Sequence, residues 1–189
     1  MKYNPDIHHR RSIRLKGYDY SQAGAYYVTT CIQGRECLFG YIKGGKILLN
    51  DAGRMVEKWW IELVNKFRDI ELDEFIIMPN HIHGIIINVG ADLRVCPDNN
   101  NDTHTNNGDT DKGEHTGSPL HRIIQWFKTM TSNEYIMAAK QYDWLRFNGK
   151  LWQRNYYEHS IRNETELNKI REYIINNPVN WELDENFKD

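Results

Sequence analysis

The sequence has 189 residues, 40% of them apolar and 12% aromatic, so it can bury one sizeable core but is short for two full domains. Its three cysteines form neither an even set nor a C-x-x-C pair, which argues against a disulfide framework and favours reduced thiols. There is no apolar secretory region and no apolar run long enough to span a bilayer, so we expect a cytoplasmic protein without membrane contact.

The formal charge of −2 argues at first against a nucleic-acid partner. However, residues 97–118 contain five acidic residues and one lysine, a net charge of −4, which leaves +2 for the rest of the chain. Cations are densest at residues 8–16, where we expect Arg10, Arg11 and Arg14 to contact phosphates. The alternative is a solvated basic arm without a function.

Runs of β-branched and aromatic residues bounded by turn residues predict five strands. These strands cover residues 25–33, 37–42, 46–49, 74–78 and 81–89. The second and third flank Lys43, Gly44 and Gly45, where the glycines can take positive φ, and they are expected to pair as a hairpin.

Apolar residues at helical spacing predict two helices in the middle of the chain. The first begins at Asn50 or Asp51, both good N-caps, and runs to about residue 68 with its tryptophans on the sheet. The second begins at Ser118 and Pro119 and runs to about residue 140. Residues 91–117 between the strands and the second helix are almost devoid of apolar side chains, and we expect a mobile insertion there.

The last part of the chain is dense in groups that can do chemistry. We expect residues 151–163 to become helical near residue 155. A further helix should begin at Asn163 or Thr165, carry Tyr173 among its inward residues, and stop at Asn177 before Pro178.

Two histidines, His81 and His83, alternate along the fifth predicted strand and therefore point to the same face. Two imidazoles that converge on one point suit a divalent cation. The alternative is a pair of ordinary strand histidines, because short motifs carry a real risk of false positives.

The chain resembles the single-tyrosine HUH transposases of the insertion-sequence 200 type, and most closely the REP-associated tyrosine transposases. Blocks from nearly the whole chain carry the resemblance in the order of the family. They are residues 24–30 (GAYYVTT), 78–83 (MPNHIH), 123–129 (IIQWFKT), 152–159 (WQRNYYEH) and 177–179 (NPV).

The resemblance implies an α+β fold: a ferredoxin-like antiparallel sheet with helices packed on one face and the two histidines on a central strand. All of residues 1–189 would form a single transposase domain around the insertion. The resemblance also implies a partner, single-stranded or hairpin DNA at palindromic repeats, and either a monomer or a homodimer. Family members cut one DNA strand and keep its 5′ end as a phosphotyrosine.

For this chemistry, Mg²⁺ or Mn²⁺ held by His81 and His83 would polarise the scissile phosphate. On a helix, Tyr156 shares a face with His159, three residues on. The tyrosine of the family also aligns with Tyr156, so we expect Tyr156 to be the nucleophile and His159 the third metal ligand.

Further phosphate contacts are expected from basic side chains in these blocks and close to them. They are Lys128, Arg154 and Arg162. Two other functions remain open: a structured nucleic-acid-binding protein that does not cleave, and a metal-dependent nuclease that uses water.

Overall fold

The computed structural model describes residues 24–88, 119–184 and 186–187. Four antiparallel strands form its main sheet, in the order β4-β5-β1-β6. Their bounds are β1 Gly24–Cys31, β4 Ile70–Ile77, β5 His81–Asn88 and β6 Tyr157–Ile161.

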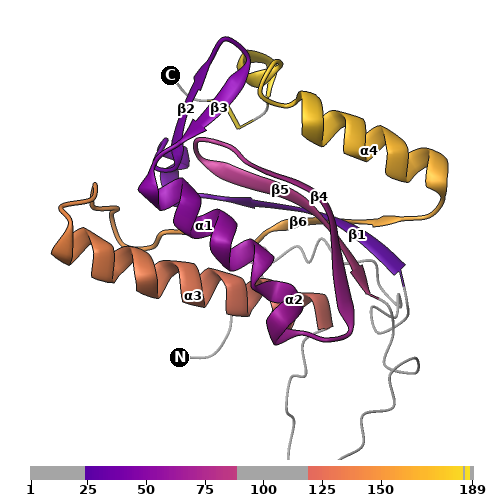
Figure 1. Cartoon of the computed structure of the whole chain (residues 1–189), viewed down its shortest axis with the longest axis horizontal. Helices are drawn as coiled ribbons and strands as arrows, with labels where there is room; N and C mark the ends of the chain where they lie inside the picture. Colours follow the sequence, from indigo (N-terminus) through magenta and orange to yellow (C-terminus); the bar gives the residue numbers. More distant parts are fainter. Residues whose placement is uncertain (1–23, 89–118, 185, 188–189) are drawn as a thin grey trace, which may run out of the picture.

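The helices and the second sheet lie around these strands (Figure 1). The helices are α1 Asp51–Ile61, α2 Leu63–Lys66, α3 Pro119–Gln141 and α4 Glu164–Asn176, with short 3₁₀ turns at Gln33–Arg35 and Trp181–Leu183. β2 Gly40–Lys43 and β3 Lys46–Leu49 form a separate hairpin, and Gly44 and Gly45 between them have φ of 58° and 70°, as the sequence predicts.

The order β1-α1-β4-β5-α3-β6 is the ferredoxin-like βαββαβ arrangement, with the β2–β3 hairpin inserted after β1 and α4 added at the end. The predicted α+β class and antiparallel sheet are therefore confirmed. So are the first predicted helix, which starts with Asn50 accepting a hydrogen bond from the Gly53 amide, and the helix that starts at Pro119.

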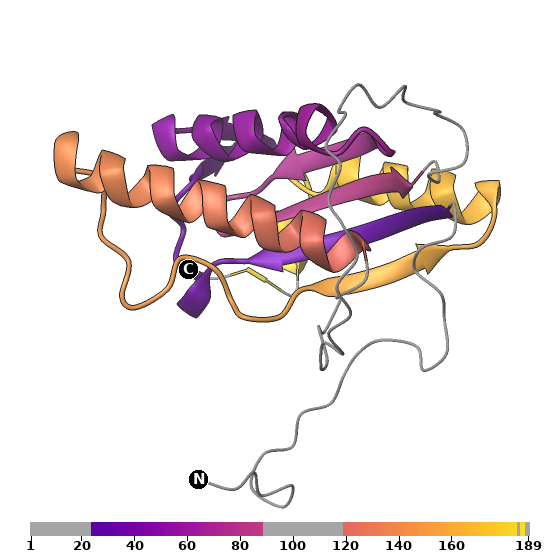
Figure 2. The ribbon, with the colours of Figure 1, turned by 90° about the horizontal axis from the view of Figure 1, so that it is seen from below.

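The helices α1 and α3 pack side by side on one face of the sheet (Figure 2). Gly84 of β5 faces them, because a Cβ at this position would lie 2.3 Å from Trp60 of α1. Trp60 also packs against Phe127 of α3, with ring centroids 5.3 Å apart. Of the two tryptophans of the first helix that were predicted to lie on the sheet, Trp60 does so, whereas Trp59 packs edge-on against Trp126 of α3, with ring centroids 5.5 Å apart.

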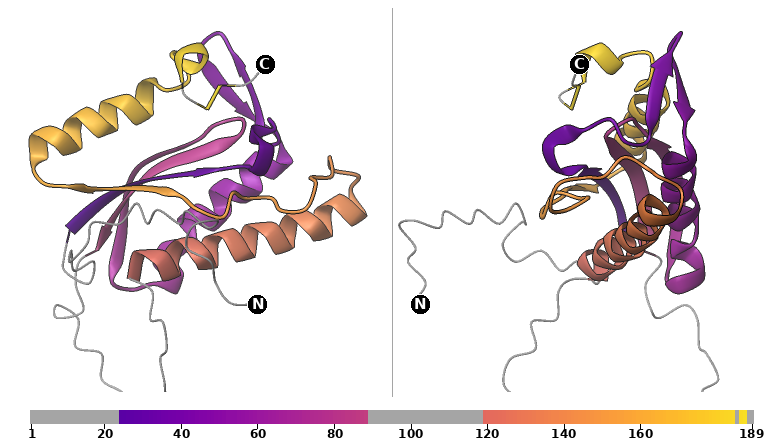
Figure 3. Two further views of the ribbon diagram at one scale, coloured as in Figure 1. Left: turned by 180° about the vertical axis from the view of Figure 1, so that it is seen from behind. Right: turned by 90° about the vertical axis from the view of Figure 1, so that its left-hand side faces the viewer.

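The expectation that helices cover one face needs a correction, because α4 lies across the opposite face (Figure 3). Tyr173 of α4 contacts His83 there, with ring centroids 5.3 Å apart. The physical reason is the alternation of β5: Ile82, Gly84 and Ile86 face α1, so His81 and His83 must face α4.

The prediction of a helix near residue 155 is wrong, since Tyr157–Ile161 form the strand β6. This segment pairs with β1, placing His159 opposite Tyr27 and Tyr157 opposite Thr29. On the side of β1 that does not face β5, the backbone N–H and C=O groups of β1 can form hydrogen bonds with this segment. An isolated helical turn would form fewer backbone hydrogen bonds. Aromatic and β-branched residues suit such a strand.

Some expectations fall outside the described residues. Arg10, Arg11 and Arg14 of the basic arm lie there, as does the predicted insertion at 91–117. Of the helices in the described ranges, none has the length and apolar character that crossing a membrane requires.

Candidate metal and nucleophile site

The imidazoles of His81 and His83 face each other on β5, with their Nε2 atoms 2.9 Å apart. Both residues are buried, at 0% and 2% exposure. The register explains their position, because Cys31 and Thr29 of β1 pair with His81 and His83 and place all four side chains on the same face.

The other ring nitrogen of each histidine has an oxygen partner. His81 Nδ1 lies 2.8 Å from Oδ1 of the buried Asn80, whose own amide donates to the Arg35 and Asn186 carbonyls. His83 Nδ1 lies 2.7 Å from the Tyr27 hydroxyl and 2.8 Å from Thr29 Oγ1. With Nδ1 engaged in this way, the Nε2 lone pairs are aimed at one shared point.

A carboxylate reaches the same point from beyond α4. Asp184 Oδ2 lies 3.7 Å from His83 Nε2, and the Asp184 side chain is 1% exposed. Its carboxylate accepts hydrogen bonds from the Asn177 amide group at 2.8 Å and from the Asn186 backbone N–H at 2.6 Å. Over the described ranges, His81, His83 and Asp184 are the group of ligand atoms that lie within 4.8 Å of one another.

The environment sets the protonation states that metal binding needs. Burial lowers the pKa of His81 well below its usual value, and the neighbouring His83 lowers it further. Burial also lowers the pKa of His83, against the opposing effect of Asp184. For Asp184, burial alone would raise the pKa, but contacts with His83, Asn177 and Asn186 outweigh it and hold the pKa far below the ordinary range. Near neutral pH the site therefore offers two neutral imidazoles and one carboxylate.

These residues fit a divalent cation. Two nitrogens that each lie about 2.1 Å from one ion at a right angle are about 3 Å apart, close to the observed separation of the two Nε2 atoms. Two neutral imidazoles with one carboxylate suit a divalent cation that keeps open positions for substrate.

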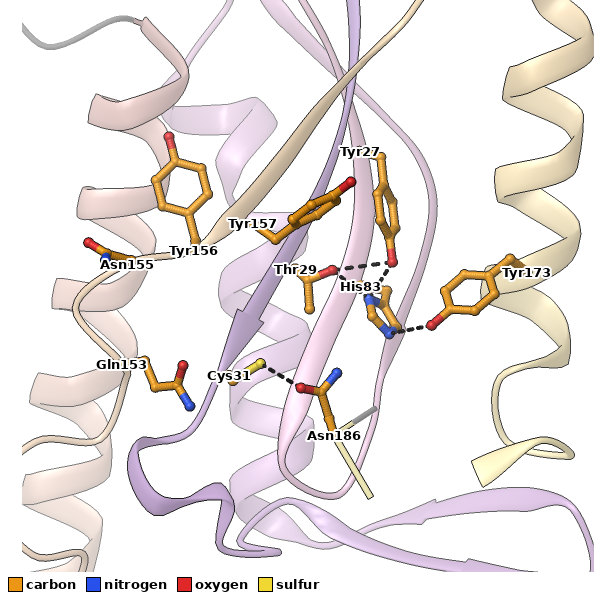
Figure 4. A pocket seen from close by; sticks show the side chains of 10 residues that line it. All are labelled: Tyr27, Thr29, Cys31, His83, Gln153, Asn155, Tyr156, Tyr157, Tyr173 and Asn186. Atoms are coloured by element: carbon orange, nitrogen blue, oxygen red, sulfur yellow. Dashed lines mark hydrogen bonds between the residues drawn. The ribbon is translucent and has the colours of Figure 1, made fainter. Parts of the chain in front are cut away.

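Tyr173 of α4 points its hydroxyl toward His83 (Figure 4). The hydroxyl lies 3.5 Å from His83 Nε2 and donates to Asp184 Oδ2 at 3.2 Å. The side chain is nevertheless 47% exposed. It lines a cavity of about 530 Å³ that also reaches Tyr27, Tyr157 and Gln153. Among the tyrosines of the described residues, Tyr173 is therefore the one that combines contact with the metal-binding group and a half-exposed side chain.

Two other tyrosines on this face have different surroundings. Burial raises the pKa of Tyr27 far above its usual value, so its hydroxyl stays protonated beside His83. Tyr157 of β6 is 49% exposed and packs its ring edge-on against Tyr27, with centroids 6.1 Å apart.

Tyr156, expected from the sequence as the nucleophile, lines the same cavity as His83, whereas His159, the expected third ligand, lies outside the metal-binding group. Tyr156 stacks on His121 of α3 (centroids 6.4 Å apart), and its hydroxyl points away from His83 in Figure 4. His159 Nε2 lies 2.8 Å from Glu166 Oε1 at the start of α4. His159 does not belong to the metal-binding group, and Asp184 takes the third place there.

The three expected phosphate-binding residues have distinct positions. Lys128 donates to the Gln153 and Asn155 carbonyls at 2.9 and 3.0 Å, and burial lowers its pKa to about 8. Arg154 is exposed on the segment before β6, and Arg162 is exposed between β6 and α4.

Sequence reasoning missed Asp184, and it counted Tyr173 only among the inward residues of the last helix. No spacing motif links Asp184 to the histidines, which precede it by about a hundred residues. Helical spacing places Tyr173 on the same face as Asn177, four residues later, but only the structure shows that Asn177 donates to Asp184.

The chain is 40% identical to a protein of Haemophilus influenzae described as uncharacterized, over all of this chain and 98% of that protein. It belongs to the same family as this protein. No family model matches the sequence. Among solved structures, a REP-associated tyrosine transposase bound to a REP hairpin is similar with a TM-score of 0.54 and 14% identity, over 91% of this chain and 74% of that one. The chain therefore has a transposase-like fold.

Proposed function

We propose that this chain, a member of that family with a transposase-like fold, is a DNA strand transferase of the REP-associated, single-tyrosine HUH type. It would cut single-stranded or hairpin DNA and hold the cut end on a tyrosine. The observation that carries the proposal is the Tyr173 hydroxyl, which meets His83 and Asp184 at 3.5 and 3.2 Å. A weak nucleophile and a candidate metal site share one accessible cavity.

The metal would be Mg²⁺ or Mn²⁺, held by His81, His83 and Asp184, and when bound it polarises the scissile phosphate and stabilises the leaving oxygen. The side chains around the site orient the ligands and the nucleophile. Asn80 and the Tyr27 and Thr29 hydroxyls keep the Nε2 atoms of both imidazoles turned toward the point that Asp184 also reaches.

Asp184 accepts the hydrogen bond of Tyr173 and so aims its oxygen. Because the pKa of Asp184 is held low, the tyrosine proton passes on to solvent, which reaches this half-exposed side chain. Attack forms a bond from Tyr173 Oη to phosphorus and breaks the bond to the 3′ oxygen, which takes a proton from water. The 5′ phosphate stays on the tyrosine, and a later attack by a 3′-hydroxyl would rejoin the strand.

The assignment of Tyr173 replaces the expectation for Tyr156. That expectation assumed a helix on which Tyr156 and His159 share a face, whereas Tyr157–Ile161 form a strand. The hairpin DNA of the solved relative supports this substrate class for the present chain.

The test is a covalent adduct with DNA. Purified protein is incubated with Mn²⁺ and a hairpin DNA that carries single-stranded flanks and a 3′-end label. We expect an SDS-stable labelled protein band that Tyr173→Phe eliminates and that Tyr156→Phe and Tyr157→Phe retain.

Each other outcome would contradict the assignment of Tyr173 or the cleavage mechanism. Loss of the band in Tyr156→Phe alone would restore the assignment made from the sequence. Cleavage without any adduct would replace the proposal by a nuclease that uses water, and the absence of cleavage would replace it by a protein that only binds structured nucleic acid.

A further inference from the structure

A second cavity of about 700 Å³ lies between α3 and the segment that precedes β6. This volume is within the range of roughly 300–1,000 Å³ that is usual for ligand sites. One wall carries Gln125, Thr129 and Asn133, which are exposed and four residues apart, so they form a polar stripe along α3. The opposite wall carries the exposed cations Lys150 and Arg154. We call this cavity the α3 groove.

The α3 groove adjoins the Tyr173 cavity. Gln153, Asn155 and Tyr156 line both of them. In Figure 4 these three residues lie on the segment that runs between α3 and β1. Lys128 donates to the Gln153 and Asn155 carbonyls and so fixes this segment as a ridge shared by the two cavities. A polymer bound at His83 can therefore pass over the ridge into the groove.

The charged and aromatic residues of the groove suit a single-stranded nucleic acid. The described lining of the groove includes Lys128, Lys150 and Arg154 and no carboxylate, which suits a chain of phosphates. At its junction with the ridge, Tyr156 is stacked with His121, and Lys128 Nζ lies 5.6 Å from the Tyr156 ring centroid. Basic grooves that contain aromatic rings are typical of proteins that bind single strands.

We propose that the α3 groove binds the single-stranded nucleic acid that continues from the reacting phosphate. Its phosphates lie along Lys150 and Arg154, and its bases face the amide and hydroxyl stripe of α3. The direction of the strand rests on the proposed function, because the reacting phosphate is placed at Tyr173. Binding itself depends on neither Tyr173 nor a metal.

The experiment measures binding by fluorescence anisotropy in EDTA, so that no cleavage occurs. One probe is a labelled DNA hairpin with a single-stranded tail of about ten nucleotides, and the other is the same hairpin without the tail. We expect Lys150→Glu/Arg154→Glu to weaken binding of the tailed hairpin at least tenfold and to leave the blunt hairpin unchanged. The salt slope for the tailed probe should fall by roughly 0.7 for each phosphate that the variant no longer neutralises.

The matched control is Lys43→Glu/Lys46→Glu, which makes the same charge change on exposed residues of β2 and β3 that line neither cavity. It should bind both probes as the wild type does. A second groove variant, Gln125→Ala/Asn133→Ala, keeps the cations and the helix, and should change the preference among tails of different base while retaining the salt slope.

Two results would overturn the proposal. One is unchanged binding of the tailed hairpin by Lys150→Glu/Arg154→Glu. The other is an equal loss of affinity for the tailed and the blunt hairpin, which would show that the groove binds duplex DNA. Tyr173→Phe should bind the tailed hairpin normally. Absence of a covalent adduct would thus contradict the proposed function and leave the groove result intact.

Discussion

Gly84 is the residue that lets α1 approach the histidine strand. It follows His83 on β5, and a Cβ added to it would lie 2.3 Å from Cζ2 of Trp60, which is fully buried. Neither the indole nor the strand can move away freely, because the indole also packs against Phe127 and Phe75. Close packing at Gly84 therefore holds the strand that carries both histidines.

We expect Gly84→Ala to lower the free energy of unfolding by about 1–3 kcal/mol, the usual cost of overpacking a core. Urea unfolding in EDTA measures it. The matched control is Gly24→Ala on β1, where an added Cβ would meet its nearest neighbour, the Tyr26 hydroxyl, at an ordinary 3.6 Å. Equal stability of the two variants would show that Trp60 can yield without cost.

At the scale of elements, α4 is attached to the sheet by an ion pair. Arg171 donates to both carboxylate oxygens of Asp73, from Nε at 2.7 Å and from Nη2. Asp73 lies where the register of β4 with β5 shifts, between Leu72 and Phe75. Since Arg171 is two residues before Tyr173, the ion pair helps to hold the helix that presents the proposed nucleophile.

The ion pair should make part of the stability depend on pH. The hydrogen bond from Arg171 is the main cause that lowers the pKa of Asp73 in the folded state. Its contribution is therefore present above the unfolded pKa of about 3.9 and is lost as the pH falls through the lower folded value.

Asp73→Asn should reduce the free energy of unfolding at a pH of about 7 by less than about 1 kcal/mol, because the Arg171 side chain is 34% exposed. The difference from wild type should shrink when urea unfolding is repeated at a pH of about 3.5. A difference that does not change with pH would mean that Asp73 is not the titrating group.

At the scale of the whole molecule, the candidate metal site joins distant parts of the chain. His81 and His83 come from β5, while Asp184 follows the 3₁₀ turn beyond α4. A metal that binds all three only in the folded protein must stabilise the complete fold.

Mn²⁺ at about one hundred times its dissociation constant should add about 2.7 kcal/mol and raise the melting temperature by about 5–10 °C. Asp184→Asn should lose most of this increase at the same Mn²⁺ concentration. His159→Gln, which alters a histidine paired with Glu166, should keep it. Differential scanning fluorimetry measures all three proteins, and loss of the increase in His159→Gln instead would return that residue to the metal.

The sequence by itself determined the elements whose signals are local. Runs of β-branched and aromatic residues between turn residues predicted β1 and β5, and the glycine turn predicted the β2–β3 hairpin. Helical spacing together with Asn50 and Pro119 predicted α1 and α3. His81 and His83 were found because strand alternation alone places neighbours two apart on one face. The resemblance led to the transposase-like fold in the same way, through short ordered blocks.

Only the tertiary structure decided the conformation of residues 157–161 and the partners of the histidines. The segment has residues suited to either state, and the open edge of β1 made it a strand, which removed the shared face of Tyr156 and His159. Tyr173 and Asp184 reach His83 because α4 crosses the sheet on the face that α1 and α3 leave uncovered. Such contacts depend on how whole elements pack, and local periodicity carries no information about that packing.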